Sequence, residues 1–228
     1  MPTKKLAATP TRFHTEFIPD KIFIAMPQVS SERRNIIPIA FLSPEFMCGD
    51  KLRVIENPTL WHFGILNSVF HMAWTRQVCG RLKSDYQYSA LIVYNNFPWP
   101  VIASEAKQST APNTGLPRRP ITSEPRAPRN DKHVVMIEAC AQAVLDARAV
   151  HANASLADLY DPLTMPANLL KAHQALDKAV DAAYGYKGAA TDAARVAFLF
   201  ERYQQITSLL PSLTNTKTKP KKMPKMSK

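Results

Sequence analysis

Glycine is scarce in this chain of 228 residues, which contains only six, at positions 49, 64, 80, 115, 185 and 188. No two of them have the spacing of a G-x-G-x-x-G fingerprint or of a P-loop, whose backbone amides surround the phosphates of a nucleotide. A glycine-rich cradle for a dinucleotide, ATP or S-adenosylmethionine is therefore absent. We expect this chain to bind no cofactor of its own.

Other catalytic signatures are also missing. The sequence contains no G-x-S-x-G, no H-E-x-x-H and no Cys/His nucleophile arrangement. Asp158 and Asp161 are spaced as at a helix end, which favours capping over an acid/base pair. His62 and His71 fall on one apolar helix, where a packed, hydrogen-bonded core histidine is the expected state. The sequence therefore predicts binding without catalysis, and no catalytic residue is assigned.

Cysteines are few, and no apolar run is long and unbroken. Cys48, Cys79 and Cys140 form no C-x-x-C and no close pair with histidine, which indicates a reducing, cytoplasmic location and no zinc site. The most apolar stretch, residues 60–78, is interrupted by polar side chains that include His62, Asn67, Ser68, His71, Arg76 and Gln77. It predicts a buried helix rather than a membrane span.

Acidic residues are outnumbered by basic ones. The 29 lysines and arginines against 18 aspartates and glutamates give a net charge of +11, for which a polyanion is the expected partner. Six of the lysines stand in the last residues without any acid, and removing them leaves +5. We expect this tail, residues 213–228, to be basic and disordered.

The order of the patterns predicts an α+β fold. Residues 1–100 show short β-branched segments, with two strands expected between 17 and 41 and a third at 52–55, then a helix from Leu60 to about Gly80 and a strand over 86–96. Residues 101–133 are rich in proline without apolar periodicity, which predicts a disordered insertion. Residues 134–212 carry three amphipathic helical faces, and Ser155 and Thr191 are the expected N-caps of two helices.

Long blocks of this sequence, in order, resemble the C-terminal part of MmeI-type (type IIL/IIG) restriction-modification enzymes. These single chains combine a nuclease, an adenine-N6 DNA methyltransferase and a target-recognition domain. The blocks are VSSERRNIIPIAFLSPE, LWHFGILNSVFHMAWTRQVCGRLKSDYQYS, IVYNNFPWP, AVLDARA, LADLYDPLTMP, LLKAHQALDKAVDAAYG and RVAFLFERYQ. The resemblance implies double-stranded DNA as partner, and S-adenosylmethionine as the cofactor of the full-length enzyme only.

The catalytic motifs of that family have no counterpart here. Its Asn-Pro-Pro-aromatic motif is not found, because Asn57-Pro58 is followed by Thr59, and no Asp…Glu-x-Lys nuclease segment occurs. The resemblance therefore implies the recognition end of such an enzyme, either as a truncated gene product or as one piece of a split enzyme. A methyltransferase/nuclease chain encoded upstream would then be a partner.

The resemblance also implies which side chains read bases. They lie at the variable positions of the stretch R-L-x-S-x-Y-x-Y-S, here Lys83, Asp85 and Gln87. On an extended segment residues two apart share one side, so all three would face one groove while Tyr86 and Tyr88 face the protein. Lysine can donate to guanine and aspartate can accept from cytosine N4, which suits a G·C pair. A solvated strand edge that avoids aggregation is the alternative.

The segment SSERR supplies hydroxyl and guanidinium donors of the kind that bind phosphates and fix register. We expect a phosphate-binding set on the DNA, with a surface turn of incidental charge as the alternative. The set comprises Ser30, Ser31, Arg33, Arg34 and Arg81.

The predicted function is thus DNA target recognition for an adenine-specific methyltransferase. Two alternatives stay open. One is a decayed fragment, because the ends of the 101–133 insertion resemble translated bacterial interspersed repeats. The other is a helical protein-interaction module whose basic tail binds acidic partners.

Overall fold

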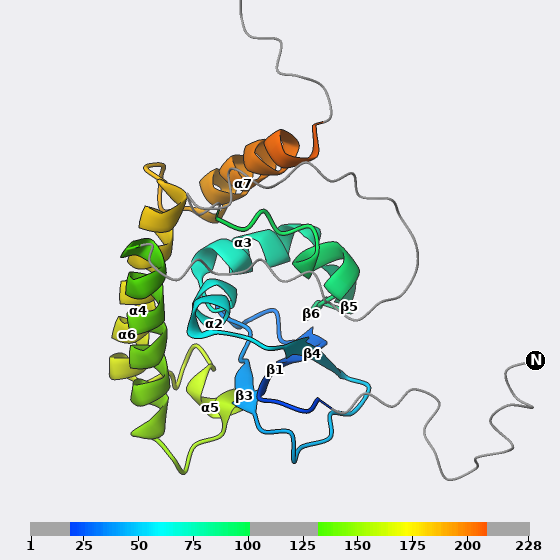
Figure 1. Cartoon of the computed structure of the whole chain (residues 1–228), viewed down its shortest axis with the longest axis vertical. Coiled ribbons are helices and arrows are strands. Elements are labelled where there is room, and N and C mark those ends of the chain that lie inside the picture. Colours follow the sequence, from blue (N-terminus) through cyan, green and yellow to red (C-terminus); the bar gives the residue numbers. More distant parts are fainter. Residues whose placement is uncertain (1–18, 101–131, 209–228) are drawn as a thin grey trace, which may run out of the picture.

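A computed structural model describes residues 19–100 and 132–208 of the chain. Strands and short helices come first and longer helices follow, which confirms the predicted α+β fold (Figure 1). Most of the insertion predicted for 101–133 and all of the tail predicted for 213–228 lie outside the described residues. The elements are β1 (Phe23–Pro27), β2 (Val29–Ser30), β3 (Ala40–Leu42), β4 (Leu52–Glu56), α2 (Leu60–Leu66), α3 (Val69–Val78), β5 (Gly80–Leu82), β6 (Asp85–Gln87), the π-helix η1 (Ala90–Tyr94), α4 (Lys132–Ala149), α5 (Leu156–Leu159), α6 (Ala167–Tyr184) and α7 (Asp192–Thr207).

Two small antiparallel sheets organise the first half of the protein. The first has the strand order β3-β1-β4 and the second the order β2-β6-β5. Only Gln28 separates β1 from β2, so the chain passes from one sheet directly into the other. The strand expected at 52–55 is confirmed as β4. The two expected between 17 and 41 are found as three, because the first is divided at Gln28 into β1 and β2, and the second is β3.

The helix expected from Leu60 to about Gly80 is two helices instead of one. The Asn67 side chain donates to the Phe63 carbonyl, and Ser68 caps α3 by accepting from the His71 amide at 3.3 Å. Because both side chains satisfy backbone groups at a helix end, the chain turns at this point. The prediction of one continuous helix over this range was therefore wrong.

The strand expected over 86–96 is also only partly correct. β6 is extended, but Ala90–Tyr94 forms a π-helical turn that buries Val93 and Tyr94. The Asn95 amide donates to the Ala90 carbonyl at 2.9 Å, and the Trp74 indole N–H donates to the Val93 carbonyl at 3.0 Å. A continuous apolar run does not distinguish a strand from a helical turn, so tertiary packing decides it.

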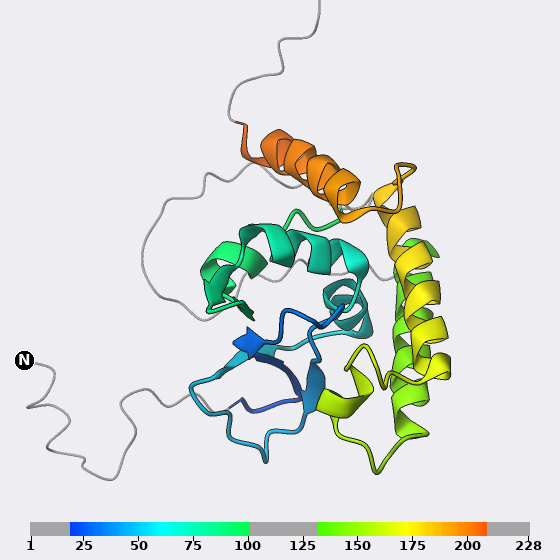
Figure 2. The same cartoon turned by 180° about the vertical axis from the view of Figure 1, so that it is seen from behind.

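One hydrophobic core joins the two halves. α4 and α6 run side by side along one flank of α2, and α7 covers α3 (Figures 1 and 2). α2 and α4 approach closely at Gly64, where an added Cβ would lie 2.6 Å from Ile137 Cγ2 and 3.2 Å from Leu176 Cδ1. A glycine is therefore needed in α2 for the helices to meet.

Gly64→Ala should destabilise the protein by about 1–2 kcal/mol, since overpacking costs ~1–3 kcal/mol and outweighs the ~1 kcal/mol that alanine gains over glycine in a helix. Urea unfolding measures this. Combining it with Ile137→Ala, which removes the clashing methyl group, should give less than the sum of the two losses. If the two losses of unfolding free energy were strictly additive, Gly64 and Ile137 would not be in contact.

The amphipathic faces predicted for the C-terminal helices are confirmed most fully on α4 and α6. Ile137, Ala141 and Val144 of α4 are fully buried, as are Leu169, Leu176 and Val180 of α6. On the described part of α7, Leu199 is buried and Val196 and Tyr203 are half-buried, whereas Phe200 and Ile206 of the expected apolar face remain exposed. Ser155 and Thr191 cap α5 and α7 as expected, and Asp158 completes the cap of α5.

The core also contains ionisable side chains. His62 and His71 are buried and hydrogen-bonded, as predicted, with His62 Nδ1 3.1 Å from the Thr59 amide and His71 Nε2 3.0 Å from the Tyr88 hydroxyl. Burial lowers the pKa of His71 to about 3. On α6, Asp177 accepts from the Val69 amide at 2.9 Å, and burial raises its pKa to about 6.

Asp177→Asn should stabilise the protein at pH 7.5 by about 2 kcal/mol and have little effect at about pH 3, below the pKa of an unfolded aspartate. The folded-state pKa of about 6 lies above the unfolded value of 3.8, so this group's contribution to stability is lost as pH rises from the lower pKa through the higher one. Asparagine keeps the acceptor for Val69 without the charge. Denaturant unfolding at both pH values, with the exposed Glu201→Gln as control, checks this. An equal loss of stability at both pH values would contradict it.

Candidate functional site

The second sheet brings the two predicted sets of DNA-contacting residues together. β2 pairs with β6, which places Ser30 opposite Tyr86. Just beyond β2, the Glu32 amide donates to Asp85 Oδ1 at 3.2 Å, and the Tyr86 hydroxyl donates to the Glu32 carbonyl at 3.1 Å. The segment 30–34 and the hairpin 80–87 therefore form one surface, which we call the loop-hairpin surface.

The pairing of β5 with β6 defines the two faces of this sheet. Leu82 lies opposite Asp85, and Gly80 lies opposite Gln87. Directly paired residues share a face, and successive residues alternate, so Asp85 and Gln87 point to one side. Tyr86 points to the other side and is only 4% exposed. Tyr88 is 2% exposed, and both tyrosines therefore face the protein as expected.

Lys83 differs from its expected position. It does not lie on a strand but begins the two-residue turn Lys83-Ser84 between β5 and β6, with φ of 57°. A left-handed backbone at a residue other than glycine costs roughly 1–2 kcal/mol, so tertiary structure fixes this turn against the local preference. Asp85 and Gln87 share a strand face, whereas Lys83 projects from the exposed hairpin tip.

The expected phosphate-binding residues fall into two groups. Ser31, Arg33 and Arg34 lie on a tight turn in which the Arg34 amide donates to the Ser31 carbonyl at 3.1 Å. Arg33 is exposed and Arg34 is half-buried. Ser30 is 3% exposed, so its hydroxyl is not presented at the surface.

Arg81 lies on the same face of the sheet as Tyr86. Its guanidinium carbon is 4.2 Å from the centre of the Tyr86 ring, and its Nη1 donates to the Ser84 carbonyl at 2.9 Å. Both contacts hold the hairpin, although the residue is also exposed. Arg81 therefore has a structural role in addition to any contact with phosphate.

Two contributors to this surface were not predicted. Arg76 of α3 donates to the Asn35 carbonyl at 3.3 Å and pairs with Asp192 of α7 at 2.5 Å, so it ties the loop to the C-terminal helices. Glu32 is the second. The sequence places it in the basic segment SSERR, and in the structure its amide donates to the Asp85 side chain and its carbonyl accepts from the Tyr86 hydroxyl. No local pattern reveals these contacts, because they join residues 41 to 116 positions apart.

Positive charge is concentrated on this surface. Residues 19–100 contain eight basic and six acidic side chains, whereas residues 132–208 contain seven basic and eight acidic ones. Four of the eight basic residues belong to the loop-hairpin surface: Arg33, Arg34, Arg81 and Lys83. The C-terminal helices described here offer no comparable excess of positive charge.

Within 19–100 and 132–208 the structure shows no group of three His, Cys, Asp or Glu side chains placed to hold a metal ion. None of the helices in these ranges is long and apolar enough to cross a membrane.

The chain is similar to known proteins over most of its length. Residues 1–101 match the family described as MmeI, target recognition domain, and residues 129–211 match the one described as MmeI, C-terminal domain. DNA methyltransferase A of Bacillus subtilis (strain 168) is 34% identical over 205 residues, which are 90% of this chain and 20% of that protein.

A solved structure of the type IIL restriction-modification enzyme MmeI in complex with DNA is 43% identical, with a TM-score of 0.77. The match covers 91% of this chain and 24% of that one. The chain therefore spans about a fifth to a quarter of the length of these relatives.

Proposed function

Since residues 1–101 belong to the MmeI target recognition domain family and residues 129–211 to the MmeI C-terminal domain family, we propose that this chain is the DNA-recognising part of an adenine-specific restriction-modification methyltransferase. The observation that carries the proposal is the 3.2 Å hydrogen bond from the Glu32 amide to Asp85. It joins the strand proposed to read bases to a basic loop in one surface, as DNA recognition requires.

Each side chain of the loop-hairpin surface has a chemical role in this proposal. Asp85 accepts from cytosine N4, Lys83 donates to the paired guanine, and Gln87 suits adenine, which offers one donor and one acceptor. Arg33 and Arg34, with Ser31, bind phosphates and set the register. Arg81, which is exposed, stacks on Tyr86 and stays in the phosphate-binding set, whereas the buried Ser30 hydroxyl is not presented to DNA.

Methyl transfer would be performed outside this chain. S-adenosylmethionine would donate the methyl group to adenine in a methyltransferase chain, and the six glycines here form no cradle for that cofactor. The isolated protein should therefore transfer no labelled methyl group to DNA, and measurable transfer would refute this assignment. Adding an upstream methyltransferase/nuclease chain should restore activity.

Arg33→Ala should weaken binding to all DNA sequences alike and lower the salt slope of log K by about 1. Fluorescence anisotropy with duplex DNA at several salt concentrations measures both quantities. The control is Lys21→Ala, which removes an exposed basic residue outside the loop-hairpin surface.

The same assay separates the rival functions. A helical interaction module with a basic tail would lose its DNA binding on neutralisation of the tail lysines and would be insensitive to Arg33→Ala. A decayed fragment would show no DNA binding in any variant. Binding that depends on Arg33 and survives neutralisation of the tail supports recognition by the loop-hairpin surface.

A further inference from the structure

Only one oxygen of the Asp85 carboxylate accepts a hydrogen bond from the described residues of the protein. Oδ1 accepts from the Glu32 amide at 3.2 Å, while Oδ2 makes no hydrogen bond to the residues that the structure describes. The next residue of β6, Tyr86, lies on the opposite face and donates to the Glu32 carbonyl at 3.1 Å. Two consecutive residues of one strand thus hold both backbone groups of Glu32.

We propose that Asp85 has two tasks, in which Oδ1 positions the basic loop and Oδ2 faces the base pair. The residue at this position would then determine both the preference for a base and the affinity of the loop for phosphates. The inference rests on the proposed function, which it deepens by making Asp85 a positioning residue as well as a reader.

The loop has few other anchors. Its internal contacts are the Arg34 amide to the Ser31 carbonyl at 3.1 Å and the Arg33 amide to Ser31 Oγ at 3.4 Å. Without Asp85, the strand pairing of Ser30 with Tyr86, the Tyr86 hydroxyl bond to Glu32 and the Arg76 bond to the adjoining Asn35 would remain as contacts from outside. A loop released at Glu32 must be ordered again when it binds phosphate, and that ordering reduces affinity for every DNA sequence.

The test compares Asp85→Asn with Asp85→Ala. Both variants remove the negative charge and therefore gain the same electrostatic attraction to DNA, but only asparagine keeps an acceptor for the Glu32 amide. Anisotropy with a duplex of random sequence should show Asp85→Ala binding about tenfold more weakly than Asp85→Asn, as expected when one ordering cost is added. The salt slope should be smaller for alanine by about 1, since one loop arginine loses its phosphate.

Two further variants control this comparison. Tyr86→Phe removes the other hydrogen bond to Glu32 without touching the outer face, so it should weaken binding to all sequences and leave base preference unchanged. Glu45→Ala removes an exposed carboxylate outside the loop-hairpin surface, so its affinity for random duplex should stay close to that of the wild type.

A measurement without DNA keeps this inference separate from the proposed function. Hydrogen exchange at the Glu32 amide should be faster in Asp85→Ala than in Asp85→Asn. Equal exchange rates, or equal affinity and salt slope for the two variants, would overturn the double role of Asp85 and leave DNA recognition intact. A wild-type protein that binds no duplex would overturn both proposals, whatever the exchange rates.

Discussion

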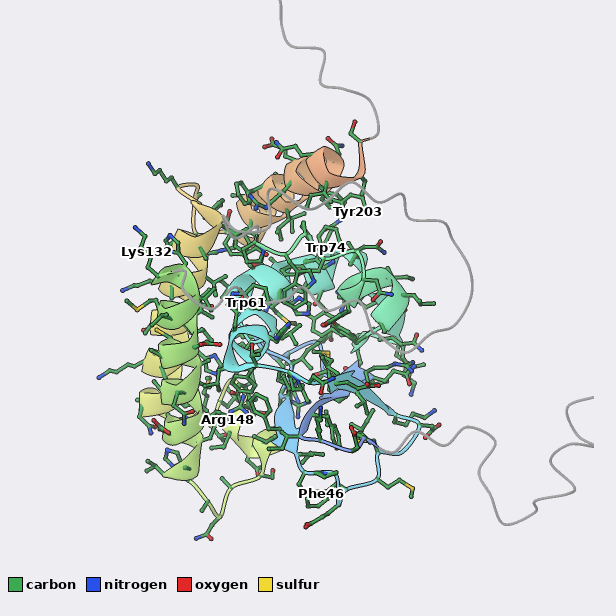
Figure 3. The ribbon with its side chains drawn as sticks, in the orientation of Figure 1. Phe46, Trp61, Trp74, Lys132, Arg148 and Tyr203 are labelled. Carbon is green, nitrogen blue, oxygen red and sulfur yellow. The ribbon has the colours of Figure 1, made fainter. Side chains whose placement is uncertain are left out.

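Arg148→Met should destabilise the whole protein by about 3 kcal/mol, because it leaves buried hydrogen-bond acceptors without a donor. Arg148 is 9% exposed, and it projects from α4 toward the strands of the first half (Figure 3). It donates to the Ile39 carbonyl at 2.8 Å, to Asn67 Oδ1 at 3.2 Å and to the Tyr160 hydroxyl at 2.8 Å. This one guanidinium therefore makes hydrogen bonds to residues of both halves of the chain.

The sign of this effect depends on a balance. Burying an arginine is costly, and no carboxylate pairs with Arg148 among the described residues, which by itself would favour an apolar replacement. Against that, the guanidinium lies 5.0 Å from the Phe63 ring centre and 4.8 Å from that of Tyr160, which stabilises the cation. Methionine fills the space but donates to neither Ile39 nor Asn67, so the loss dominates.

Urea unfolding monitored by the tryptophans of the first half and by helical circular dichroism measures the prediction. Both signals should shift to the same lower midpoint, since one core spans both halves. Arg202→Met, which removes a half-buried arginine of α7, is the control and should cost less than about 1 kcal/mol. Wild-type stability in Arg148→Met would show that the guanidinium positions the halves without stabilising them.

Local pattern predicted the elements better than it predicted their ends. The strands β1 and β4 and the buried faces of α4 and α6 follow from apolar periodicity, which short segments carry in themselves. The turn at Asn67-Ser68 and the π-helix at Ala90–Tyr94 do not, because side-chain caps and tertiary packing decide them. Arg148 was not singled out, since its partners lie 12 to 109 residues away.

The candidate site shows the same division. Resemblance to a family supplied the residues of the hairpin, and donor chemistry supplied those of the loop, but nothing in the sequence placed Glu32 against Asp85, 53 residues away. Strand spacing correctly put Asp85 and Gln87 on one face. It failed for Lys83, because a two-residue turn begins there and the backbone turns left-handed.

The largest expected change in recognition follows from exchanging the two charges of the hairpin. Lys83→Glu with Asp85→Arg, in a full-length enzyme carrying this module, should turn a preference for a G·C pair into one for the inverted C·G pair. Arginine donates to guanine, and glutamate accepts from cytosine, so the donor and acceptor ends are reversed. Such contacts discriminate by roughly 1–3 kcal/mol per base pair, enough to change which adenines are methylated.

The positions of the two residues limit how well this exchange works. Lys83 stands at the hairpin tip and Asp85 on the strand, so the new side chains must meet the base pair from unequal distances. The Asp85→Arg change also removes the acceptor that holds the Glu32 amide, so total affinity should fall while the preference inverts. Sequencing of methylated sites in the double variant decides between these effects. An unchanged recognition site with normal activity would show that Lys83 and Asp85 do not read this base pair.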